Sequence, residues 1–132
     1  MVIIRRWVRG ILWIDGVGAL AAGVVMLVLR RFFGGLYELP VDLITTIGLV
    51  NLAYAAVALT LAARKRRRVT WIAALALANL AWALVCVLLV LRFHRDATFF
   101  GVGHFVLEGA WVAMLGTVEW RNRQALAGVC AV

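Results

Sequence analysis

Two ionisable side chains, His104 and Glu108, lie four residues apart inside a long apolar segment of the sequence. At this spacing, both side chains project from the same face of a helix. Charged groups are costly within hydrocarbon, so an acid placed there marks a functional site by default. Glu108 is therefore a candidate proton site or cation ligand. The structural alternative is that Glu108 hydrogen-bonds Asn51 or Asn79 and ties neighbouring helices together.

The other long apolar segments also carry polar side chains, which are Asp15, Asn51, Tyr54 and Asn79. At a helical rise of about 1.5 Å per residue, Asn51 falls near the depth of Glu108, close to the middle of a bilayer. We expect Glu108 to point toward Asn51 and Asn79, because in lipid its oxygen atoms would otherwise lack partners. These side chains, together with His104, form the predicted ligand- or proton-binding site.

Asp15 lies on a helix face that is otherwise built of small residues, including Ala19 and Gly23. Small residues at this spacing allow a second helix backbone to approach closely. The pattern predicts that the face of Asp15, Ala19 and Gly23 is a helix–helix contact. We expect Asp15 to pair with Arg9 or with a polar group of the second or third apolar segment.

Glu119 falls at the end of the last apolar segment, beside Trp120 and Arg121. A carboxylate at a membrane surface can reach water. We therefore expect Glu119 to pair with a basic loop residue and to have no part in chemistry.

Residue patterns typical of metal, haem or nucleophilic chemistry are missing from the sequence. The two histidines, His94 and His104, do not supply the ligands of a buried haem. The chain has no His-Glu-x-x-His motif, no P-loop and no serine, and Cys86 and Cys130 do not form a Cys-x-x-Cys pair. We expect no cofactor and no metal, and the sequence gives little support to a metal enzyme or a hydrolase.

The elements that must position these residues are four apolar segments, each long enough to cross a bilayer as a helix. The sequence is 66% hydrophobic and 15% charged, and its mean hydropathy is +1.02. Because lipid cannot satisfy free backbone groups, each segment should be helical. The prediction is an all-α integral membrane protein that forms a single domain over residues 1–132. We expect an up-down-up-down four-helix bundle, in which successive helices are antiparallel neighbours. The predicted helices cover residues 10–29, 43–63, 69–91 and 98–118, and residues 119–132 form a cytoplasmic tail.

The distribution of basic residues predicts the orientation of the bundle. The net charge is +8, and ten of the 14 Lys and Arg residues fall on the side that holds both termini and the second loop. Basic residues favour the cytoplasmic side, so both termini are predicted inside. Their short tracts between apolar segments argue against nucleic-acid binding. The densest tract sets topology and could also contact acidic lipid headgroups; it comprises Arg64, Lys65, Arg66, Arg67 and Arg68.

Several short motifs are spread over most of the chain: Asp15-Gly16 with Gly23, Leu39-Pro40, Asn79-Leu80-Ala81-Trp82, Gly101 and Glu119. In these features the chain resembles small four-helix bacterial inner-membrane proteins that have no assigned function. The resemblance implies a multi-pass protein of the bacterial inner (cytoplasmic) membrane and no particular activity.

Two classes of function are compatible with this sequence. The first is a non-enzymatic membrane module, either an accessory or assembly protein or a binder of an apolar ligand within the bundle. The second is a small proton- or cation-coupled transporter in which Glu108 titrates. Four helices leave little room for a pathway, so transport would require a homo-oligomer. The expected partners are membrane lipids and a second copy or another membrane protein.

Overall fold

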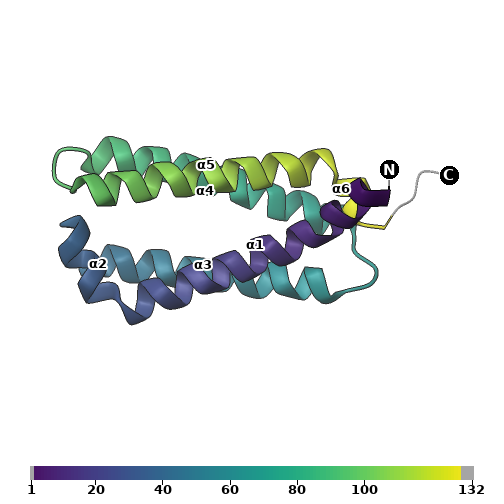
Figure 1. Ribbon diagram of the computed structural model, residues 1–132, viewed down its shortest axis with the longest axis horizontal. Coiled ribbons are helices and arrows are strands. Elements are labelled where there is room, and N and C mark those ends of the chain that lie inside the picture. The colour runs from purple at the N-terminus through teal and green to yellow at the C-terminus, as the bar shows by residue number, and fades with distance from the viewer. Residues whose placement is uncertain (1, 129–132) are drawn as a thin grey trace.

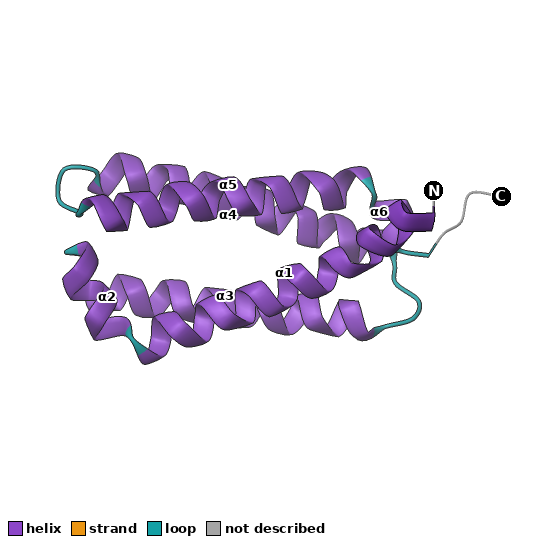
Figure 2. Ribbon diagram, in the orientation of Figure 1, coloured by secondary structure: helices purple, strands orange, loops and turns teal. Residues whose placement is uncertain are grey.

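The structure, a computed structural model, describes residues 2–128, without the side chains of residues 2–5, 8 and 9. Cys130 and the side chain of Arg9 lie outside the described residues. In this part of the chain all regular structure is α-helical (Figures 1 and 2). The helices are α1 (Val2–Val28), α2 (Arg30–Tyr37), α3 (Val41–Ala63), α4 (Val69–Phe93), α5 (Phe99–Arg121) and α6 (Arg123–Leu126).

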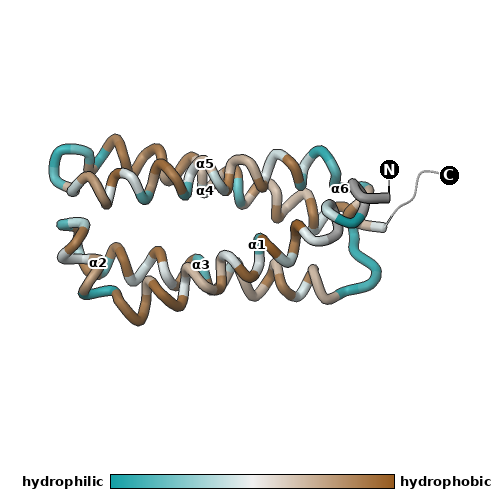
Figure 3. Tube along the Cα trace, in the orientation of Figure 1, coloured by the Kyte–Doolittle hydropathy of each residue, from teal (hydrophilic) through white to brown (hydrophobic). Residues whose placement is uncertain are grey.

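Four of these helices are long and apolar enough to cross a membrane, which confirms the predicted all-α fold with four candidate spans. The spans are Gly10–Val28, Val41–Ala63, Val69–Phe93 and Phe99–Arg121, and their bounds lie within three residues of the predicted ones. Only 22–28% of each span is buried inside the chain. The helices are therefore apolar on their outer faces too, while hydrophilic residues gather toward the loops and ends (Figure 3).

The four spans form two hairpins. Helix α1 packs along α3, and α4 packs along α5, whereas the two hairpins contact each other mainly near their ends (Figure 1). The predicted antiparallel packing of successive helices is confirmed within each hairpin. It is wrong for α3 and α4, which barely touch. The cause lies in the loop between α3 and α4. Its two end residues, Arg64 and Arg68, are extended, so the loop leads from one hairpin across to the other.

Glycines bring the helices close within each hairpin. A Cβ added at Gly23 would lie 3.0 Å from the Gly48 carbonyl oxygen on α3, and one added at Gly116 would lie 2.8 Å from the Ala76 carbonyl oxygen on α4. The predicted close contact at Gly23 is therefore confirmed. Ala19, on the same predicted face, instead borders a space between the hairpins.

Two apolar clusters hold the ends of the hairpins together. One contains Leu12, Ile72 and Leu126, and the other contains Ile44 and Phe105. Helix α6 contributes to the first cluster, so the described part of the predicted tail folds back onto the spans. The polar residues lie between these clusters.

Replacing Gly23 with leucine is expected to reduce the free energy of unfolding by about 1–3 kcal/mol through overpacking. The new Cβ would lie 2.8 Å from Leu52 Cδ2, in addition to its contact with Gly48. Thermal unfolding of the purified protein in detergent measures the change. Gly103→Leu is the matched control, since a Cβ added there meets nothing within 4 Å. Equal melting temperatures for the two variants would contradict the close contact.

Candidate functional site

A cavity of about 440 Å³ lies between the two hairpins and is lined by residues from all four spans. Its walls are largely apolar, with small residues such as Ala19 and Ala22 on the α1 side. The cavity brings together all six residues that the sequence singled out as candidates. Its polar lining consists of Asp15, Asn51, Tyr54, Asn79, Trp82, His104 and Glu108.

The cavity reaches the outer surface of the bundle. Its lining includes Val50, Trp111 and Leu107, whose exposed fractions are 41%, 47% and 73%. These side chains lie in the middle of apolar spans, where the surroundings of a membrane-crossing helix are hydrocarbon. The opening therefore faces the side of the bundle rather than its ends.

Glu108 contacts two polar side chains on the wall of the cavity. His104 Nε2 lies 2.8 Å from Glu108 Oε2, and Trp82 Nε1 donates to Glu108 Oε1 at 2.7 Å. The other ring nitrogen of His104, Nδ1, lies 3.3 Å from the Tyr37 hydroxyl. Burial raises the pKa of Tyr37, and the charge of Glu108 raises it further, so this phenol keeps its proton.

The expected partners of Glu108 are only partly correct. The spacing of four residues does bring His104 and Glu108 together, but the predicted bond from Asn79 is wrong, because that amide is used elsewhere. The Asn51 amide donates to the Ile47 carbonyl oxygen of its own helix at 3.0 Å. Trp82 was missed, although a tryptophan within a span needs an acceptor for its indole N–H.

A second polar cluster borders the cavity and joins the two hairpins. Asn79 Nδ2 donates to Asp15 Oδ2 at 3.2 Å and to Glu119 Oε2 at 3.1 Å. Tyr54 also donates its hydroxyl to Asp15 Oδ2. The predicted pairing of Asp15 with polar groups of the second and third spans is thus confirmed.

Glu119 does not reach water, so the expected pairing with a basic loop residue is wrong. Its side chain is completely buried, because α5 continues to Arg121 and directs this position toward α4. The sequence contained a signal that Glu119 faces the interior. Glu119 follows Glu108 by eleven residues, which is about three helical turns and returns to the same face of α5.

The cavity lining contains acidic side chains but no strongly basic ones. It includes the carboxyl groups of Asp15 and Glu108 but no lysine or arginine. In the part of the chain that the structure describes, no group of three His, Cys, Asp or Glu side chains could hold a metal ion. The arrangement can accept hydrogen bonds and attract a cationic or hydrogen-bond-donating group.

No protein-family model, characterised protein or solved structure matches this chain.

Replacing Asn79 with leucine is expected to destabilise the protein by about 1–3 kcal/mol, because it removes the shared donor from two buried carboxyl groups. Unfolding in detergent, followed by circular dichroism, measures the loss. Asn51→Leu provides the control: it makes the same change in the neighbouring hairpin, where the amide donates to a carbonyl oxygen of its own helix and does not join two buried carboxyl groups. If the two variants were equally stable, Asn79 would not be joining the hairpins.

Proposed function

We propose that this chain is a membrane-embedded binding protein that holds an amphiphilic small molecule in the cavity between its hairpins. The supporting observation is a laterally open, mainly apolar cavity with a few converging polar groups. Small-molecule sites commonly have this composition and volumes of about 300–1,000 Å³. At about 440 Å³, the cavity is large enough for a compact ligand.

The apolar walls and the side opening favour a ligand that is dissolved in the bilayer. Such a molecule would enter past the exposed side chains of Val50, Leu107 and Trp111. The hairpins meet chiefly near their ends, so small adjustments between them can admit a ligand without disrupting the packing within either hairpin. An accessory or assembly role would not require a cavity of this kind.

The polar groups favour a ligand that carries a hydrogen-bond donor. The hydrogen bonds to Asp15 both end on Oδ2, and Asn51 uses its Nδ2. Asp15 Oδ1 and Asn51 Oδ1 are therefore acceptors for a ligand at the cavity. An amine or a hydroxyl at one end of an apolar body fits this pattern.

Filling the cavity tests the proposal. Gly18 lines the cavity, and a Cβ added there meets nothing within 4 Å, so Gly18→Leu should fold normally and occupy the ligand space. Mass spectrometry of compounds co-purified in mild detergent should show that Gly18→Leu loses a small molecule retained by the parent. Gly103→Leu, which is equally open but outside the cavity, should retain it. The same bound compounds at the same occupancy in both variants would refute the proposal.

A second candidate function is transport coupled to protons or cations, and the pair of His104 and Glu108 favours it. The two side chains lie 2.8 Å apart on the wall of the cavity, where a passing substrate could change the protonation of the pair. Transport would use the same ligand site and would require an oligomer to complete a pathway.

Substitutions of Glu108 separate binding from transport. Glu108→Gln should retain the fold and the bound ligand, because an amide can still accept the bond from Trp82. Glu108→Leu should be less stable by about 1–3 kcal/mol, since the Trp82 and His104 donors lose their acceptor. Proton flux into liposomes containing the protein gives the decisive comparison. Loss of flux in Glu108→Gln with ligand retained supports transport, while a parent without flux leaves binding as the function.

A further inference from the structure

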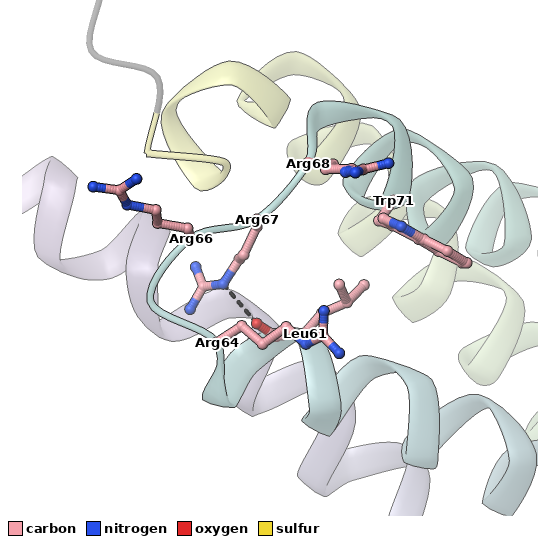
Figure 4. A pocket seen from close by; sticks show the side chains of 6 residues that line it. All are labelled: Leu61, Arg64, Arg66, Arg67, Arg68 and Trp71. Carbon is pink, nitrogen blue, oxygen red and sulfur yellow. Dashed lines mark hydrogen bonds between the residues drawn. The ribbon is translucent and has the colours of Figure 1, made fainter.

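A second pocket lies outside the hairpin cavity, at the connection between α3 and α4 (Figure 4). Its volume is about 370 Å³. Four of the five basic residues in the loop line it, and the remaining one, Lys65, does not. The lining consists of Leu61, Arg64, Arg66, Arg67, Arg68 and Trp71.

Arg67 fixes the shape of this pocket. Its Nε donates to the Leu61 carbonyl oxygen at 2.6 Å, and its Nη2 donates to that of Ala62 at 2.7 Å. Its Nη1 donates to the carbonyl oxygen of Leu126, the last residue of α6, at 3.1 Å. The carbonyl groups at the end of α3 thus gain a donor, and the loop is attached to α6.

The other arginines are available to a ligand. Arg64, Arg66 and Arg68 are exposed, and none forms an ion pair among the residues described. In Figure 4, Arg68 extends beside the Trp71 ring and Arg64 lies across the opening near Leu61, whereas Arg66 points away on the α6 side. Arg64 and Arg68 therefore place two uncompensated positive charges around a partly apolar opening.

We propose that this pocket binds the phosphate of an anionic lipid headgroup. Arginine forms paired hydrogen bonds with phosphate oxygens, and Arg64 and Arg68 supply them. Tryptophan is enriched at the level of lipid headgroups, where the start of α4 places Trp71. The exposed ring of Trp71 gives the upper part of an acyl chain an apolar contact. A soluble phosphate would use the arginines but gain nothing from Trp71, so the structure favours a lipid.

The test must separate a defined pocket from attraction by net charge. The detergent-purified full chain is titrated with phosphatidylglycerol and with phosphatidylcholine, and native mass spectrometry counts the bound lipids. Arg64→Gln/Arg68→Gln should weaken phosphatidylglycerol binding at least tenfold, since each basic residue near an anionic headgroup contributes roughly fivefold. Arg30→Gln/Arg31→Gln removes the same charge at the other end of the bundle and should change the affinity less than twofold.

A single-site comparison covers the case in which the double variant is unstable. Arg68→Gln alone should weaken binding roughly fivefold, while Lys65→Gln, in the same loop but outside the pocket, should leave it unchanged. Equal losses in these two variants would overturn the site in favour of net charge. Equal affinity for phosphatidylcholine would overturn the anionic specificity. Displacement by glycerol phosphate at the concentration effective for phosphatidylglycerol would show a soluble-phosphate site instead.

Discussion

The hydrogen bonds of one amide, that of Asn79, connect the two halves of this molecule. Lipid offers no partner to a polar group, so every such group within a span must be satisfied by the protein or by a bound ligand. Asn79 donates to one oxygen atom of each of two carboxyl groups, those of Asp15 on one hairpin and Glu119 on the other. The apolar clusters hold the hairpins together toward either end, and the polar groups lie between them.

The cavity is a consequence of how the close packing is distributed. Gly23 and Gly48 bring α1 and α3 into near backbone contact, and Gly116 does the same for α4 and α5. The helices therefore pack closely within each hairpin, and the two hairpins make few contacts with each other. Polar side chains of moderate length then face one another across the remaining space. Because the hairpins pack loosely against each other, the space between them becomes a site with apolar walls and a few hydrogen-bonding groups.

The sequence was sufficient to predict the spans and the polar residues of the cavity, because both depend on local properties. Segment length and hydropathy decide which residues cross the bilayer, and the cost of a polar group in lipid identifies Asp15 and Glu108 without knowledge of any neighbour. The pairing of these groups was less predictable. Depth follows from helical rise, but the direction of a side chain around the bundle depends on which helices pack together. The extended loop separated α3 from α4, and helix α5 continued far enough to bury Glu119.

The basic residues of the chain lie at the two ends of the bundle, whereas the cavity between the hairpins carries acidic side chains and a histidine but no lysine or arginine, and this division bears on what the cavity can do. The arginines of the α3–α4 loop lie outside the cavity, so no fixed positive charge balances Asp15 or Glu108 there. Their carboxyl groups instead lie against side chains without a fixed charge: Tyr54 and Asn79 donate to Asp15, and Trp82 and His104 lie against Glu108. An arginine would keep its charge under all conditions, because it is not deprotonated in proteins. A cationic ligand in the cavity would therefore meet two carboxyl groups and no competing fixed positive charge, which favours an amine among the proposed ligands.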